Sequence, residues 1–139
     1  MTAVLREVEL DAQVSLRGEP PMAPNSIAGD ALWLGPDEWL VLGGREQDSS
    51  EALAAVDVSA NRVCLELGGP GAADVLSCGC ALDLHPSVFP PGRCAQTLLA
   101  RAQVILYRTD EHTFRLLVRP SYADYLRAWL RDAMVERKS

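Results

Sequence analysis

Thiol and imidazole side chains gather in one short stretch of the chain. Cys78 and Cys80 flank a glycine, and His85 and Cys94 follow a few residues later. A Cys94–His85 pair would lower the thiol pKa and create a nucleophile. Proximity in sequence alone does not bring two groups into hydrogen-bond reach. We therefore expect Cys94 to pack as a small apolar residue and His85 to hydrogen-bond within a rigid loop.

The same residues could bind zinc. Structural zinc sites are built from Cys-x-x-Cys pairs, or from one such pair with two histidines. Here the spacing is Cys-x-Cys, and Cys64 and Cys94 lie alone on either side. This spacing disfavours a metal site. We expect all four cysteines to be free thiols, as is usual in a reducing compartment.

Other polar motifs fit structural roles. Gly68–Gly71 precedes an expected helix, where anions can bind, but it lacks a Walker lysine and the full dinucleotide spacing. Asp83 lies between two leucines, so we expect partial burial and hydrogen bonds from nearby backbone donors. His112 occupies a polar hairpin turn and is expected to be solvated. The sequence thus predicts no catalytic, cofactor-binding or metal-binding residue.

A proline-rich block surrounds these candidates and runs from Gly79 to Thr97. Proline fixes φ, removes a backbone donor and extends the residue before it. We therefore expect neither helix nor regular strand in the block. A chain without evident chemistry is expected to bind and position something else, so we predict an exposed apolar area near this block.

The N-terminal half is predicted to contain an arm, a hairpin, a short helix and a strand. Residues 1–30 are predicted to form an irregular arm, in which a helix or edge strand is possible over Val4–Leu16. Ala31–Leu34 and Trp39–Gly43 predict a hairpin around a Pro36-Asp37 turn. Capping-box spacing at Asp48–Glu51 predicts a short helix through Val56. Alternating residues in Arg62–Leu67 predict a strand, with Val63, Leu65 and Leu67 on one face.

The second half predicts a helix after Pro70 that ends at Gly79, then strands at Thr97–Ala100, Gln103–Arg108 and Phe114–Val118. A final helix should begin near Ser121. Its apolar stripe, at i, i+3, i+4 and i+7 spacing, comprises Tyr122, Tyr125, Leu126, Trp129, Leu130, Ala133 and Met134. Residues 135–139 should fray.

These elements predict an α+β fold in which helices pack on one face of a small, largely antiparallel sheet. The 139 residues suit one domain, with its core in residues 31–134. A net charge of −6 argues against nucleic-acid and anionic-membrane partners. No apolar run approaches the roughly 20 residues of a membrane span. The N-terminus lacks a secretory core, so we expect a cytoplasmic protein.

The chain resembles the gamma subunit of heterotetrameric sarcosine oxidase from about Ala31 to Ala133. The most specific match is the block from Cys80 to Thr97, although Ala81 stands where proline is expected. Gly69-Pro70, the Tyr107–Phe114 hairpin and the Trp129-Leu130 helix end are also similar to the folate-binding fold of aminomethyltransferases. The resemblance implies a reduced version of that fold. The further matching segments are Leu34–Leu40, Val58-Ser59 and Val118–Leu130.

The resemblance implies one subunit of an alpha, beta, gamma and delta assembly. That enzyme oxidatively demethylates sarcosine to glycine, forms hydrogen peroxide and passes one-carbon units to tetrahydrofolate. FAD and FMN lie in and between the two large subunits, NAD and folate belong to alpha, and zinc belongs to delta. No catalytic residue of the family falls on gamma. We therefore expect a non-catalytic subunit that binds no cofactor and docks on alpha, beta or delta through Cys80 to Thr97 and the N-terminal arm.

Two alternatives remain open at this point. The wider fold similarity allows a free-standing folate-binding or one-carbon-transfer protein, although 139 residues are few for a full aminomethyltransferase site. The cysteines allow a zinc or thiol enzyme, which would carry bound metal or one unusually reactive cysteine.

Overall fold

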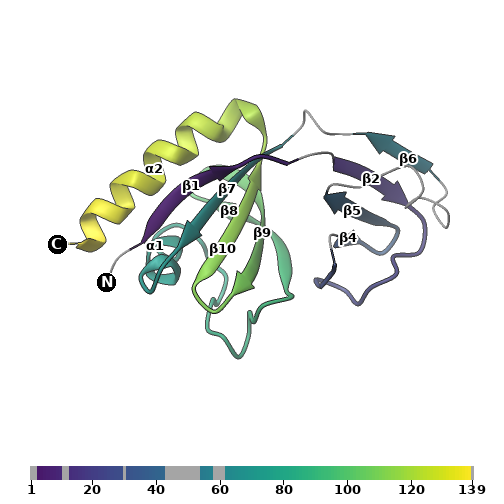
Figure 1. The fold of residues 1–139 in the computed structure, drawn as a ribbon, viewed down its shortest axis with the longest axis horizontal. Helices are drawn as coiled ribbons and strands as arrows, with labels where there is room; N and C mark the ends of the chain where they lie inside the picture. The colour runs from purple at the N-terminus through teal and green to yellow at the C-terminus, as the bar shows by residue number, and fades with distance from the viewer. Residues whose placement is uncertain (1–2, 11–12, 30, 43–53, 58–61, 139) are drawn as a thin grey trace.

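Two antiparallel sheets of five strands each form the framework of the molecule (Figure 1). The computed structural model describes residues 3–10, 13–29, 31–42, 54–57 and 62–138. The first sheet has the order β1 (Val4–Val8), β7 (Val63–Gly68), β10 (Thr113–Val118), β9 (Ala102–Asp110) and β8 (Cys94–Leu99). The second has the order β3 (Ile27–Ala28), β4 (Ala31–Gly35), β5 (Glu38–Leu42), β2 (Gln13–Arg17) and β6 (Ala54–Asp57).

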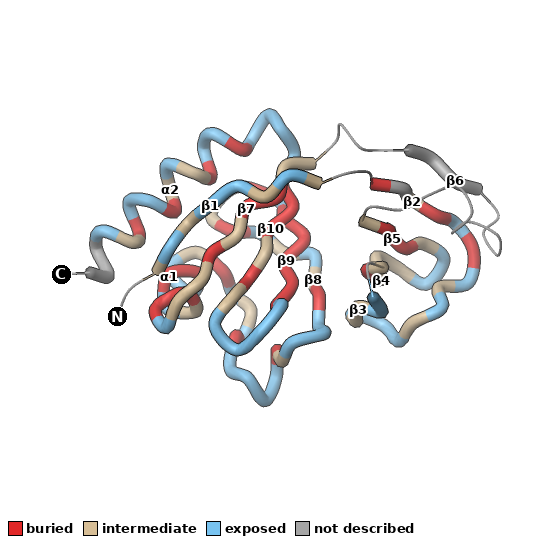
Figure 2. Tube along the Cα trace, in the orientation of Figure 1, coloured by how far each residue is buried: buried red, intermediate tan, exposed pale blue. Residues whose placement is uncertain are grey.

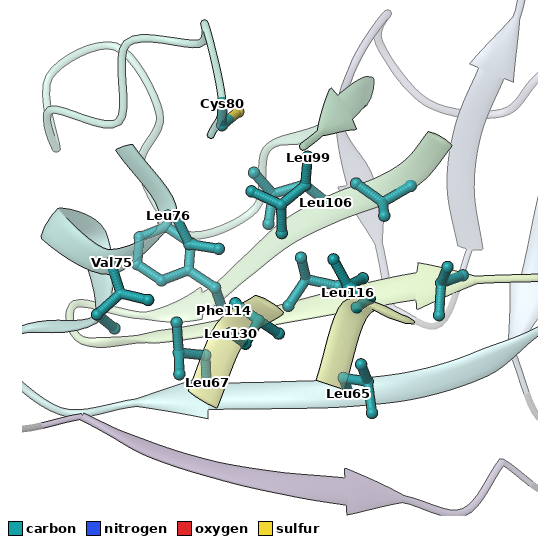
Figure 3. Packing of buried hydrophobic residues seen from close by; sticks show 14 of the residues in the cluster. Leu65, Leu67, Val75, Leu76, Cys80, Leu99, Leu106, Phe114, Leu116 and Leu130 are labelled. Atoms are coloured by element: carbon teal, nitrogen blue, oxygen red, sulfur yellow. The ribbon is translucent and has the colours of Figure 1, made fainter. Parts of the chain in front are cut away.

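Helices α1 (Ala72–Ser77) and α2 (Pro120–Lys138) cover one face of the first sheet (Figure 1). Their apolar residues share a core with β7, β8, β9 and β10. In Figure 3 the side chain of Phe114 extends toward Val75 and Leu76 of α1, and Leu130 of α2 and Leu67 of β7 lie nearby. The predicted α+β class, with antiparallel strands and helices on one sheet face, is confirmed. The prediction of one small sheet is wrong, because the strands divide into two sheets through pairings between residues distant in sequence.

The opposite face of the first sheet packs in part against the second sheet. Cys64, Ile105 and Leu117 of the first sheet pack with Leu32 and Leu40 of the second. Successive residues of a strand point to opposite faces, so Cys64 joins this inter-sheet core while Leu65 joins the helix-side core. The predicted alternation in this strand is therefore confirmed. Figure 2 shows the result as buried residues along β7, β9 and β10.

The N-terminal segment is more regular than predicted. β1 pairs with β7 at the sheet edge, so an edge strand was the right alternative there. β2, however, lies between β5 and β6, and Leu16 is fully buried. The description of residues 1–30 as an irregular arm is wrong for both strands. Five-residue strands carry little periodic signal, and their partners here are distant in sequence.

Three boundaries also differ from prediction. The prediction of a helix through Val56 is wrong for residues 54–57, which form strand β6. The expected start of that helix, residues 48–53, lies outside the described residues. The proline-rich block is irregular only to Arg93, since β8 begins at Cys94. α2 continues to Lys138, so residues 135–138 are helical where fraying was predicted, and residue 139 lies outside the described residues.

The apolar stripe of α2 is narrower than the spacing predicted. Leu126 and Leu130 are fully buried and Ala133 nearly so, as expected. Tyr122 and Tyr125 are instead exposed and pack edge to face on each other. Ala123 of the first turn and Leu126 of the next are buried in the helix-side core, so these positions face the sheet and the two tyrosines do not.

Candidate functional site

The irregular part of the block, Cys80–Arg93, forms a loop that we call the proline loop. Two buried side chains flank an exposed segment of this loop. Leu84 and Phe89 are buried in the helix-side core, with Phe89 stacked on Phe114. Between them lies a tight turn, in which the amides of Val88 and Phe89 both donate to the carbonyl of His85 at 2.9 Å. The exposed part of the loop is thus held by two apolar anchors.

A buried arginine, Arg108, holds the same loop through hydrogen bonds to its backbone. Arg108 of β9 is only 4% exposed, and its guanidinium lies 4.6 Å from the centre of the Phe114 ring. It donates to the carbonyls of Leu84 at 3.1 Å and Phe89 at 2.8 Å, and to that of Glu111 at 2.6 Å. Among the described residues no carboxylate forms an ion pair with it. Its charge is compensated by backbone dipoles, which fixes the shape of the loop.

Sequence analysis did not single out Arg108 as an anchor. The available signal was an arginine directly after a continuous apolar run, Val104–Tyr107, in an expected strand. A charged residue in that position needs several hydrogen-bond partners. Nearby irregular backbone, such as the proline loop, is a source of unpaired carbonyls.

The structure separates Cys94 from His85. The Cys94 thiol lies 3.4 Å from the carbonyl of Ser26 and 3.5 Å from that of Trp33, and burial raises its pKa to about 11. The His85 ring instead lies 2.8 Å from the Ser87 hydroxyl. The expectation that Cys94 packs and His85 hydrogen-bonds within its loop is confirmed. This arrangement makes Cys94 a poor nucleophile.

The remaining candidates also have local structural roles. Asp83 accepts a hydrogen bond from the His85 amide at 3.0 Å, as expected, but Asp83 is exposed and the expected partial burial is wrong. His112 is exposed, and its amide donates to Asp110. Gly69 adopts a φ of 108°, which favours glycine, and donates to the His112 carbonyl. The glycine run is thereby used to turn the chain into α1.

The cysteines do not converge. Cys78 is exposed, whereas Cys64, Cys80 and Cys94 are buried. Burial also raises the pKa of the Cys64 thiol. Within the described ranges, no three side chains of histidine, cysteine, aspartate or glutamate lie close enough to hold a metal ion. The three buried thiols, those of Cys64, Cys80 and Cys94, therefore act as packing groups.

A cleft of about 550 Å³ opens between the two sheets. One wall carries Tyr107, Arg108 and Arg115, and the other is apolar and includes Ile27 and Leu32. Burial raises the pKa of Tyr107, so its hydroxyl stays neutral. Sequence analysis could not find this cleft, because its walls come from different sheets. Its polar wall contains no carboxylate–histidine or thiol–histidine pair suited to acid–base or nucleophilic work.

No helix within the described residues has the length and apolar character needed to cross a membrane.

The arrangement of two sheets and flanking helices identifies the class of fold. Glycine cleavage system aminomethyltransferase T from Bartonella henselae matches with a TM-score of 0.66 over 93% of this chain and 45% of its own, at 14% identity. At that identity the match concerns the fold alone. The chain therefore has the two-sheet α+β fold shared with aminomethyltransferases, as the sequence resemblance implied.

Relatives with higher sequence identity show which family the chain belongs to. The profile of the "Sarcosine oxidase, gamma subunit family" matches residues 12–136. Sarcosine oxidase subunit gamma from Corynebacterium sp. (strain U-96) is 38% identical over 95% of this chain and 79% of its own length. The Arthrobacter sp. subunit is 36% identical over 96% and 80%. The chain belongs to the sarcosine oxidase gamma subunit family.

A solved structure agrees with this assignment. A chain of heterotetrameric sarcosine oxidase from Corynebacterium sp. U-96, determined in complex with pyrrole 2-carboxylate, superposes with a TM-score of 0.89. The match covers 99% of this chain and 86% of that chain, at 36% identity. The fold and the sequence thus lead to the same family.

Proposed function

We propose that this chain is the non-catalytic gamma subunit of a heterotetrameric sarcosine oxidase-type enzyme. The observation that carries the proposal is the near-complete superposition, at a TM-score of 0.89 and 36% identity, on a chain of a heterotetrameric sarcosine oxidase. The structural roles of Cys94, His85 and Asp83 agree with a subunit that leaves the chemistry to its partners.

The assembly would oxidatively demethylate sarcosine to glycine, form hydrogen peroxide and pass the one-carbon unit to tetrahydrofolate. FAD, FMN, NAD, folate and zinc would be held by the alpha, beta and delta subunits. The gamma subunit would bind none of them, and the assembly would be cytoplasmic. These details come from the family resemblance.

We propose the proline loop as the main docking element. Arg108 and the buried Leu84 and Phe89 fix its shape, while the tip between them exposes Pro86 and Val88, the latter at 49%. A loop ordered before binding loses little entropy when it docks. The N-terminal arm contributes less to docking than the sequence suggested. Its strands β1 and β2 pair within the two sheets, and the Asn25 carbonyl accepts a hydrogen bond from the Cys94 amide.

Co-expression with the proposed alpha, beta and delta subunits tests the proposal. Tagged gamma should retain all three partners and show sarcosine-dependent hydrogen peroxide formation, whereas the isolated chain should show neither flavin absorbance nor turnover. Turnover by the isolated chain would refute the non-catalytic role.

The docking element has its own test in the same system. Val88→Asp places a charge on the loop tip and should lower the amount of partner retained about tenfold, the size of a moderate interface hot spot. Val135→Asp, at a valine of α2 that is 69% exposed, is the control and should retain the partners normally. Equal retention by both variants would remove the proline loop from the interface.

A further inference from the structure

A second, smaller hollow lies on the sheet face that the second sheet covers only in part. It has a volume of about 330 Å³. Its lining includes residues just before β7 and just after β10, and Figure 1 shows these strand ends near the start of α2. Its apolar floor is formed by Ile105 and Leu117, which also belong to the inter-sheet core. Gln96, Leu98 and Gln103 line one side of this hollow.

Two arginines, Arg62 and Arg119, line the other side, and we call the hollow the arginine pocket. Neither forms an ion pair with any of the described residues. Glu38 attracts Arg62 from a distance, but the Glu38 carboxylate already accepts a hydrogen bond from Ser15 at 3.0 Å and lies 3.7 Å from Arg17. The pocket therefore concentrates positive charge on a protein whose net charge is −6.

The two positive charges affect one another. Partial burial and the repulsion from Arg119 both lower the pKa of Arg62. Holding two guanidinium groups close together is unfavourable unless an anion lies between them. The first turn of α2, which follows Arg119 directly, contains no acidic residue that could supply it. The charge balance of the pocket is thus incomplete within the described chain.

We propose that the arginine pocket binds a carboxylate side chain of a neighbouring subunit, an inference that rests on the proposed assembly. The planar fork of arginine matches a carboxylate, and arginine is enriched at protein interfaces. Leu98, half exposed at the pocket, favours a polypeptide over a free ion, because a polypeptide can bury this leucine while its acidic side chain enters between the arginines. The pocket would form a docking point separate from the proline loop.

Retention of gamma by the other three subunits, measured at low and high salt, tests the proposal. Arg62→Gln and Arg119→Gln should each weaken retention about tenfold, as expected when one side of an interfacial charge pair is removed. Salt should weaken the wild-type complex more than the double variant. Arg131→Gln, at an exposed arginine of α2, is the matched control.

The outcomes separate this inference from the proposed function. If wild-type gamma fails to retain alpha, beta and delta, the assembly itself is wrong. If wild-type and both pocket variants are retained equally, only the arginine pocket is refuted. Thermal unfolding of the isolated variants provides a second readout, because loss of a repelling charge should leave the midpoint unchanged or raised. A lowered midpoint for Arg119→Gln, which is exposed, would indicate an internal structural role and contradict the proposal.

Thermal unfolding with added inorganic phosphate or citrate distinguishes the source of the anion. Stabilisation by these ions that disappears in Arg119→Gln, together with normal assembly of that variant, would indicate a free-anion site and overturn the partner carboxylate.

Discussion

Gly79 lies directly against the indole ring of Trp129. A Cβ added at Gly79 would lie 2.6 Å from Cζ2 and 2.8 Å from Cη2 of that ring. The Gly79 carbonyl accepts a hydrogen bond from the Ala100 amide at 3.0 Å, which restricts movement away from the ring. The absence of a side chain at Gly79 thus allows the end of α1, the β8–β9 turn and α2 to meet just before the proline loop.

Gly79→Ala should destabilise the protein by about 1–3 kcal/mol, because the added methyl group overlaps the ring. Its φ is not in the positive range, so the cost is one of space. Urea unfolding measures the change. Gly35→Ala is the matched control, since nothing lies within 4 Å of its added Cβ, and should change stability by less than about 0.5 kcal/mol. Equal effects at both positions would contradict the packing argument.

Arg108→Leu should loosen the proline loop. The substitution leaves the carbonyls of Leu84, Phe89 and Glu111 without their donor, at a total cost of about 2–4 kcal/mol. Hydrogen exchange should accelerate at the amides of Val88 and Phe89. Arg101→Leu, at an exposed arginine, should leave their exchange unchanged. Unaltered protection in Arg108→Leu would mean that the loop holds its shape without this anchor.

Alkylation of the folded protein should show one cysteine thiol that reacts faster than the others. Cys78 is exposed and should react first, and the fast phase should vanish in Cys78→Ser. Cys94 should react slowly, because its pKa of about 11 leaves roughly one molecule in a thousand as thiolate at pH 8. Peptide mass spectrometry over a time course measures both rates. A Cys94 that reacts faster than Cys78 in the folded protein would revive the thiol-enzyme alternative.

Glu66 should stabilise the fold at neutral pH and lose this effect in acid. The side chain lies between Arg6 and Arg115, and hydrogen bonding to Arg6 holds the pKa of its carboxyl below the ordinary value. A depressed folded-state pKa adds stability above the unfolded value, and this stability is lost as pH falls through the folded value. Glu66→Gln should therefore cost about 1 kcal/mol at pH 7.

The cost of Glu66→Gln should shrink progressively below about pH 4. Urea unfolding at several pH values measures this trend. Glu19→Gln, at an exposed carboxylate, should show no such pH-dependent difference. A cost for Glu66→Gln that stays constant into acid would show that its charge does not contribute.

The sequence predicted the elements that depend on residues close together along the chain. The Pro36-Asp37 turn between β4 and β5, the alternation in β7 and the periodic core of α2 all follow from neighbouring residues. The α+β class followed from the same signals. The sequence also correctly indicated that Cys94 is packed, that His85 hydrogen-bonds within its loop and that His112 is exposed.

The remaining features depend on contacts between distant residues. β2 becomes a central strand only because β5 and β6 lie on either side of it. Arg108 becomes an anchor only because the proline loop brings the carbonyls of Leu84 and Phe89 to it. Arg62 and Arg119 share a pocket because β7 and β10 pair antiparallel, which places Val63 opposite Val118. Composition and spacing along the chain do not encode such pairings.

Native mass spectrometry of material purified on tagged gamma, co-expressed with the proposed alpha, beta and delta subunits, tests the central claim most directly. The account predicts one species containing one copy each of alpha, beta, gamma and delta. Recovery of gamma alone, under conditions in which the other three subunits assemble with one another, would contradict it.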